Sequence, residues 1–212
     1  FEQEERAAYN DMKDHLIAMV EGKEVVAANA AVKMLKLRQG TSGFFFDEDG
    51  NIVHTGTSKL KELLSLLEEI GDHQVIIWDH FHEEGDRIMK KLSKKAGRVD
   101  GTIVSQQTKI DTVNAFIDGH IQYLVAHPAS LGHGVTLTNC SYAVYFSLSH
   151  SYELYVQSRD RIYRKGQKNA CTYYHIIAAN SVDNAIMRAL KSKGDVVDAV
   201  LNYLKGENGD PD

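Results

Sequence analysis

The sequence predicts an α/β fold in which a mostly parallel sheet is covered by helices on both faces. Two observations support this. Four apolar runs of strand length recur from residue 74 onward: QVIIW (74–78), IQYLVAH (121–127), YAVYFSL (142–148) and CTYYHIIAA (171–179). Such runs are typical of strands buried on both faces. Helical segments separate them, and regular β–α–β alternation requires right-handed crossovers between parallel strands.

A helical N-terminal appendage and a small β-hairpin are expected to precede this sheet. Apolar side chains at helical spacing predict helices over 2–20 and about 24–38, the second ending at Gly40. The segment GFFFDEDGNIVHTG (43–56) predicts a hairpin around an Asp-Gly turn. We interpret this acidic segment as a plain turn and not as a calcium-binding loop, because its glycine comes too early and no Glu occupies the twelfth position. We expect domains over 1–55 and 56–212.

The remaining elements follow from periodicity, caps and breakers. Helices are expected over 59–70, 83–95, 105–119 and 151–166, with a short edge strand at 98–101. A last helical region begins at Ser181, its predicted cap, and is interrupted near Gly194. The tail from Lys205 to Asp212 predicts a frayed end.

Composition excludes several classes of function. The chain has 212 residues, a net charge of -5 and two cysteines without metal-site spacing. This charge argues against a protein that coats nucleic acid by bulk electrostatics, although a local basic site remains open. Its apolar runs are too short to cross a bilayer, so no membrane partner is expected. The chain starts at Phe1, and we interpret it as a fragment of a longer protein.

The stretch QSRDRIYRKGQ (157–167) is the first candidate site. On a helix ending at Gly166, the side chains of Gln157, Arg161 and Arg164 would share one face, with Asp160 able to orient Arg164. Two guanidiniums and an amide form a donor array that suits phosphate oxygens. A solvated basic helix end is an equally weighted alternative. Arg159, Lys165 and Lys168 are left for the surface.

The loop HPASLGHGVTLTN (127–139) is the second candidate. It follows a buried strand, and Gly132 and Gly134 would allow backbone amides to approach a phosphate closely. The third is DHFHEEGD (79–86), where His80 and His82 suggest a metal site. A polar loop and helix start is the favoured interpretation of that segment.

The chain lacks a GxxxxGK[ST] phosphate cradle, a GxSxG elbow and an HExxH motif. Arginines aimed at phosphate without a cradle fit a chain that supplies arginine fingers to a nucleotide held elsewhere.

QSRDRIYRKGQ resembles motif VI of Swi/Snf-type ATPases of helicase superfamily two, in the form Q-x-x-D-R-x-x-R-x-G-Q, at all six fixed positions. SLGHGVTLTNCSYAVYF is similar to motif V, QVIIWDHF to motif IV, and DGTIVSQQTKIDTVNAF to the motif between them. MLKLRQ resembles the L-x-x-L-R-Q of the segment that links the two lobes of these enzymes. The sequence departs from these family motifs at four positions, which indicates a divergent member, such as a phage or bacterial one. The four residues are Leu131, Thr136, Ser147 and Lys109.

The resemblance implies a RecA-like fold and the C-terminal lobe of a two-lobed motor. ATP and Mg²⁺ would be held mainly by an N-terminal RecA-like lobe of the same polypeptide, which this chain lacks. Arg161 and Arg164 would be catalytic arginine fingers, and Gln157, Gly132 and Gly134 would bind nucleotide. Double-stranded DNA would contact His80, Asp100, Gly101 and Thr136.

The full-length protein would then be a DNA-dependent ATPase or helicase, and this fragment alone would be inactive. Its location would be the cytoplasm of a bacterial or phage-infected cell, or the nucleus if it is eukaryotic. The alternative is a non-catalytic RecA-like module that binds DNA or a protein.

Overall fold

A computed structural model describes residues 1–18, 27–47, 49–132 and 134–205. The chain forms two compact units, one of residues 1–61 with 177–212 and one of residues 62–176. This division does not test the domain boundary that we predict between residues 55 and 56, which stays a prediction. The frayed tail predicted over 205–212, apart from Lys205, lies outside the described residues, as do the end of the first helix and the start of the second.

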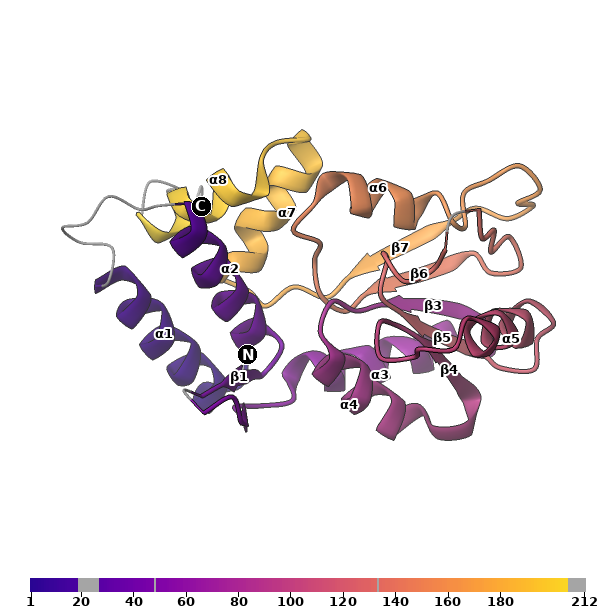
Figure 1. The fold of residues 1–212 in the computed structure, drawn as a ribbon, viewed down its shortest axis with the longest axis horizontal. Helices are drawn as coiled ribbons and strands as arrows, with labels where there is room; N and C mark the ends of the chain where they lie inside the picture. The colour runs from indigo at the N-terminus through magenta and orange to yellow at the C-terminus, as the bar shows by residue number, and fades with distance from the viewer. Residues whose placement is uncertain (19–26, 48, 133, 206–212) are drawn as a thin grey trace. The chain divides into compact units, whose positions relative to one another are not determined.

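The unit of residues 62–176 is built on a parallel sheet of five strands (Figure 1). Its strands are β3 (Val75–Trp78), β4 (Ala96–Val99), β5 (Tyr123–Ala126), β6 (Tyr142–Tyr145) and β7 (Thr172–His175), in the order β4-β5-β3-β6-β7. Every residue of β3 and β5 is buried, as the continuous apolar runs predict. Strand β4 forms one edge, as expected from its short sequence. The predicted α/β class is therefore confirmed.

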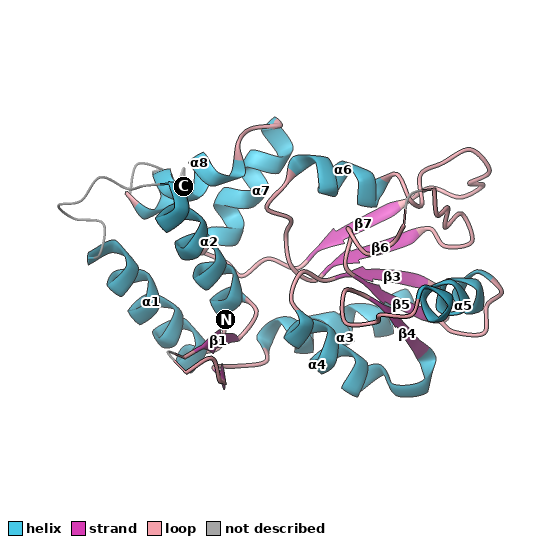
Figure 2. Ribbon diagram, in the orientation of Figure 1, coloured by secondary structure: helices cyan, strands magenta, loops and turns pink. Residues whose placement is uncertain are grey.

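Helices cover both faces of this sheet (Figure 2). They are α3 (Ser58–Ile70), α4 (His82–Leu92) with the 3₁₀ turn Ser93–Lys95, α5 (Gln106–Ile117) and α6 (Tyr152–Arg159). The chain crosses from β3 to β4 through α4 and returns from β4 to β5 through α5. Because right-handed crossovers in opposite directions lie on opposite faces, α4 and α5 sandwich the β4–β5 edge.

The unit of residues 1–61 and 177–212 contains the helices predicted at both ends of the chain. They are α1 (Gln3–Ala18), α2 (Ala27–Thr41), α7 (Val182–Ser192) and α8 (Val196–Leu204). Ser181 caps α7 in a capping box with Asn184, as the sequence predicts. The buried Lys59 ammonium lies 2.6 Å from the Asp183 carboxylate, so the start of α3 is tied to the start of α7.

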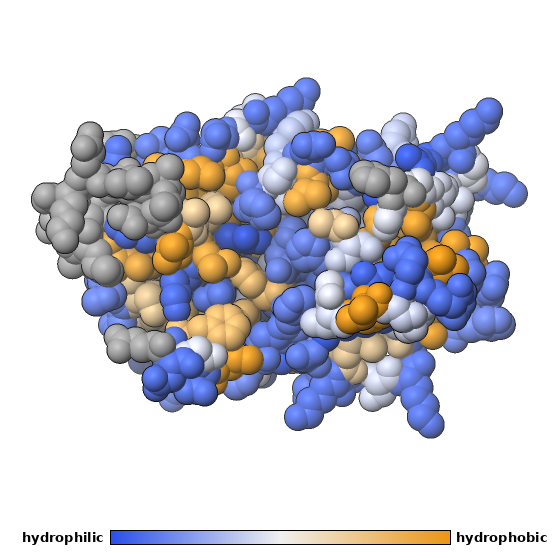
Figure 3. All heavy atoms as spheres, in the orientation of Figure 1, coloured by the Kyte–Doolittle hydropathy of each residue, from blue (hydrophilic) through white to orange (hydrophobic). Residues whose placement is uncertain are grey.

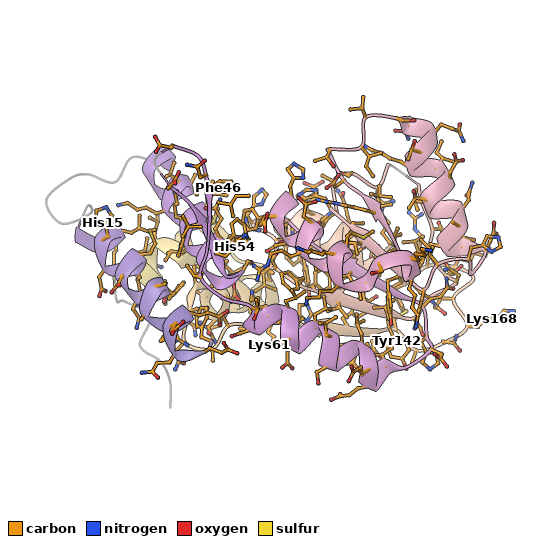
Figure 4. The ribbon with its side chains drawn as sticks, turned by 90° about the horizontal axis from the view of Figure 1, so that it is seen from below. His15, Phe46, His54, Lys61, Tyr142 and Lys168 are labelled. Carbon is orange, nitrogen blue, oxygen red and sulfur yellow. The ribbon has the colours of Figure 1, made fainter. Side chains whose placement is uncertain are left out.

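The prediction that Gly40 ends the second helix is wrong, because the helix continues to Thr41. Glycine is needed at position 40 for packing: a Cβ there would lie 2.6 Å from Cζ of Phe45. The turn comes at Gly43, where φ is +80°. The hairpin that follows is confirmed, with β1 (Phe44–Phe46) paired to β2 (Ile52–His54) in antiparallel register; Figure 4 labels Phe46 and His54 on its two strands.

None of the helices among the described residues combines the length and the hydrophobicity needed to cross a membrane.

Candidate functional site

The helix predicted over residues 151–166 is shorter in the structure, where α6 ends at Arg159. The buried Ser158 hydroxyl donates a hydrogen bond to the Tyr155 carbonyl oxygen at 2.7 Å, a local bond that competes with helix continuation. The Arg161 amide then bonds to the Ser158 carbonyl, three residues back, at 3.3 Å. The backbone therefore leaves the helix one residue before the first predicted arginine finger.

The carbonyl group of Arg161 also leaves the helical direction. It accepts a hydrogen bond of 2.8 Å from the Leu137 amide, whereas a continuing helix would use it for Lys165. The interpretation that Gln157, Arg161 and Arg164 share one helix face is therefore wrong. Only Gln157 lies on α6, and the two arginines lie in the turns that follow it.

Both arginines instead dock onto the loop before β6, the second candidate stretch. The Arg161 guanidinium donates hydrogen bonds to the carbonyl oxygens of Val135 and Leu131, each at 3.2 Å. Arg164 donates to the Thr136 hydroxyl at 3.0 Å and to the Gly134 carbonyl at 3.4 Å. The two stretches that the sequence analysis singled out are thus joined by four hydrogen bonds from arginine side chains.

A small hollow of about 230 Å³ opens where these stretches meet. It is lined by Gly134, Gln157, Asp160, Arg161 and Arg164. The Gln157 amide is held by the Glu153 carboxylate, one turn earlier on α6, at 3.0 Å. The three predicted residues therefore line one hollow, but Gln157 comes from α6 and the two arginines come from the turns that follow it.

The two arginines bring positive charge to this hollow. Arg161 is only 7% exposed, and burial lowers its pKa, as does the neighbouring charge of Arg164. Asp160 lines the hollow, yet neither arginine forms an ion pair with it or with any other carboxylate in the described part of the chain. A buried guanidinium bonded only to carbonyl groups can still receive an anion, and a phosphate group has the matching geometry.

The glycines of the loop leave its backbone open. Gly134 has a φ of +90°, which favours glycine, and a Cβ at Gly132 or Gly134 would meet no atom within 4 Å. Residue 133 lies outside the described residues.

Lys168, one of the cations left for the surface, is exposed and lies at the same end of this unit as Tyr142, the first residue of β6 (Figure 4).

The four predicted DNA-contact residues lie on three different segments of the chain. Thr136 belongs to the arginine site through its bond to Arg164. His80 lies in the loop after β3. Its ring packs edge-on against the rings of His127 and His150, with centroid distances of 5.3 and 6.5 Å. Asp100 and Gly101 follow β4, and a Cβ at Gly101 would lie 3.8 Å from Cε1 of His82.

The Asp100 carboxylate is engaged inside the protein. It lies 2.5 Å from Nη2 of Arg98 and 3.2 Å from Nδ1 of His82, and it accepts hydrogen bonds from the amide and hydroxyl groups of Thr102. Burial alone would raise the pKa of Asp100, but these partners outweigh it and bring the pKa to about 2. Asp100 is thus a fixed anion that shapes the turn containing Gly101.

Sequence reasoning missed a buried polar network beneath this edge of the sheet. The Glu84 carboxylate accepts hydrogen bonds from the amides of His80 and Phe81 and from the Ser147 hydroxyl, at 2.8–3.2 Å. It therefore ties the loop after β3 to the segment after β6. Ser147, where the sequence departs from the family pattern, was the residue that could have indicated this network.

Asp79 lies beside this network with 2% of its surface exposed. Burial raises its pKa well above the usual range, and the neighbouring Glu84 carboxylate adds to the effect. Gly85 leaves room for the side chains of Asp79 and Arg98, since a Cβ at position 85 would lie 2.6 Å from the Asp79 carboxylate and from the Arg98 guanidinium. The described residues contain no group of three side chains arranged to hold a metal ion.

Comparison with known proteins identifies a family for this chain. A family model described as the helicase conserved C-terminal domain matches residues 58–166. Protein p41 of Acyrthosiphon pisum secondary endosymbiont phage 1 is 28% identical over 207 residues, which cover 94% of this chain and 43% of that protein. The human DNA excision repair protein ERCC-6-like is 26% identical over 177 residues, covering 82% of this chain and 13% of that protein. The chain thus spans less than half the length of these relatives.

Solved structures show the same fold. The Sulfolobus solfataricus SWI2/SNF2 ATPase core in complex with double-stranded DNA matches with a TM-score of 0.72 and 18% identity, covering 98% of this chain and 46% of that one. The C-terminal domain of the Sulfolobus solfataricus SWI2/SNF2 ATPase matches with a TM-score of 0.67 and 17% identity, covering 95% of this chain and 90% of that domain.

Proposed function

Because the chain belongs to the family of the helicase conserved C-terminal domain, we propose that it is the second motor lobe of an ATP-dependent DNA translocase. Its fold is the RecA-like C-terminal lobe of SWI2/SNF2 ATPases. An N-terminal lobe of the same polypeptide would hold ATP and Mg²⁺, and this chain would complete the site.

The observation that supports this proposal most strongly is the Arg161 side chain. It is almost buried, it is anchored by two carbonyl oxygens, and it lies beside Arg164 without a carboxylate partner among the described residues. Placing a charge in this way is costly unless an anion pairs with it. A γ-phosphate held by another lobe would supply the anion, and preorganised guanidiniums would stabilise the charge that develops during hydrolysis.

The other predicted residues take supporting roles in this proposal. Gln157, held by Glu153, would position the attacking water or the arginines. The open backbone at Gly132 and Gly134 would face nucleotide or DNA phosphate, and Thr136 would orient Arg164. His80 and the backbone at Gly101 would contact the DNA backbone, with Asp100 fixing the turn. Such contacts are independent of base sequence and fit a chain with a modest net charge of -5.

ATP hydrolysis by the purified 212-residue chain, compared with the full-length protein, tests this proposal. We expect no turnover above background from this chain, with or without duplex DNA, and DNA-stimulated turnover from the full-length protein. Robust turnover by the 212-residue chain would contradict the proposed division between two lobes. A full-length protein that binds DNA but hydrolyses no ATP would instead support the non-catalytic module.

A further inference from the structure

A second cavity is lined in part by the loop whose carbonyl groups accept the hydrogen bonds of Arg161. It has a volume of about 350 Å³, and its lining comes mainly from α5 and from residues 130–132, 135 and 136. Its apolar wall consists of Val99, Ile110, Val113, Ile117, Leu131 and Val135. Pockets that bind small molecules have volumes of this order and mostly apolar linings.

Two residues of the apolar wall are open to solvent. Ile110 and Ile117, one above the other on α5, are 44% and 41% exposed. On the face drawn in Figure 3, hydrophobic surface gathers beside α5. Contiguous exposed apolar surface next to a hollow is typical of a binding site, whereas single exposed apolar residues are ordinary.

Polar side chains at the rim have unused hydrogen-bonding capacity. Gln106, Lys109 and Asn114 line the cavity from α5. Their side chains make no hydrogen bond or ion pair with any described residue. Two amides and one unpaired ammonium group thus surround an apolar wall, and a few polar groups converging on such a wall fix the orientation of a ligand.

From this lining we propose that the cavity binds a small aromatic anion. A flat ring would pack between Ile110, Val113 and Val135, and the negative group would pair with Lys109. Carboxylate, sulfonate and phosphate all satisfy the second requirement.

The ligand would contact the loop that positions the arginine site. Leu131 and Val135 form part of the cavity wall, and their carbonyl oxygens accept the hydrogen bonds of Arg161. Thr136 lines the cavity and accepts the bond of Arg164. A ligand that fixes this loop therefore changes the phosphate site, and a phosphate bound there changes the affinity of the cavity by the same factor.

Titration of the 212-residue chain with naphthalene-2-sulfonate, followed by ¹H–¹⁵N NMR, tests the proposal without using ATP hydrolysis. We expect saturable shifts of the amide signals of α5 and of residues 130–132, 135 and 136, with a dissociation constant on the order of 1 mM. Ethanesulfonate, which carries the charge without the rings, is expected to cause no saturable shift. The result is independent of the proposed motor function.

Variants locate the site. Asn114→Trp, at an exposed position of the lining, is expected to fill the cavity and abolish the shifts. Lys109→Glu is expected to weaken binding roughly fivefold or more, because it replaces attraction with repulsion. Val104→Ser is the matched control, since Val104 is 95% exposed and lies outside the lining. Absence of saturable shifts in the wild-type chain, or equal binding by Asn114→Trp, would overturn the proposal.

Discussion

The Arg164 guanidinium donates a hydrogen bond of 3.0 Å to the hydroxyl oxygen of Thr136. These two residues come from the two stretches that resemble motifs VI and V, twenty-eight positions apart in the chain. The bond fixes an otherwise exposed arginine at the edge of the hollow. Thr136 thus offers an acceptor at a position where this sequence departs from the pattern of motif V.

Thr136→Val should weaken catalysis by the full-length protein, because it removes the acceptor and keeps the shape of the side chain. We expect DNA-stimulated ATP turnover to fall roughly three- to tenfold, the value of one hydrogen bond. Thr136→Ser should retain most of the turnover. Thr138→Val is the control, since the Thr138 hydroxyl makes no hydrogen bond with the described residues. Unchanged turnover for Thr136→Val would show that the bond to Arg164 has no role.

The buried pair Tyr145 and Ser158 should contribute to stability as a unit. Their hydroxyl groups lie 2.8 Å apart, and Ser158 also donates to the Tyr155 carbonyl. Ser158→Ala should lower the free energy of unfolding by about 1–3 kcal/mol, because it leaves the Tyr145 hydroxyl buried without that partner. Tyr145→Phe should cost less, since Ser158 keeps its second bond.

A double-mutant cycle measured by denaturant unfolding checks this pair. The double variant should lose less stability than the two single variants together. Strictly additive losses would mean that the two hydroxyl groups do not interact.

Asp79→Asn should stabilise the protein at neutral pH. Burial and the Glu84 carboxylate raise the pKa of Asp79 above the usual 3.8. The folded state therefore binds the proton more tightly than the unfolded state, so wild-type stability falls as the pH rises from 3.8 toward the folded pKa. Asparagine does not titrate and escapes this loss. The free energy of unfolding at pH 7 should rise by more than about 1 kcal/mol.

Unfolding measured between pH 3.5 and pH 8 decides this prediction. The advantage of Asp79→Asn should shrink as the pH falls below 4, where both proteins carry a neutral group at position 79. Asp111→Asn, on the exposed side of α5, should show no comparable trend. A destabilised Asp79→Asn across the whole range would show that the carboxylate is required in its charged form.

The sequence was most informative where apolar pattern and local chemistry agree. Strands β3, β5 and β6 follow continuous apolar runs, and the Ser181 cap of α7 follows from its neighbours alone. The convergence of Gln157, Arg161 and Arg164 was also predicted, but from an incorrect helix. The end of α6 depends on the bonds of Ser158 and on the Leu137 amide, which is distant in sequence.

The buried carboxyl network was hidden for the same reason. Glu84 looks like an ordinary acidic residue in the first turn of a helix, and its bond to Ser147 depends on the neighbouring positions of β3 and β6 in the sheet. Likewise, the contact between His82 and the Asp100 carboxylate depends on the packing of α4 against β4. Only tertiary structure brings such pairs together.

Arg161→Ala in the full-length protein tests the central claim most directly, through turnover and nucleotide affinity measured together. The account predicts a fall in DNA-stimulated turnover of about 10³-fold or more, with nucleotide affinity changed only a few-fold. Arg161→Lys should not restore turnover, because an ammonium group cannot replace a guanidinium with two fixed hydrogen bonds. Arg159→Ala, which removes a cation stacked over Tyr155 and Tyr173, should leave turnover near wild type. Near-wild-type turnover by Arg161→Ala would contradict the account.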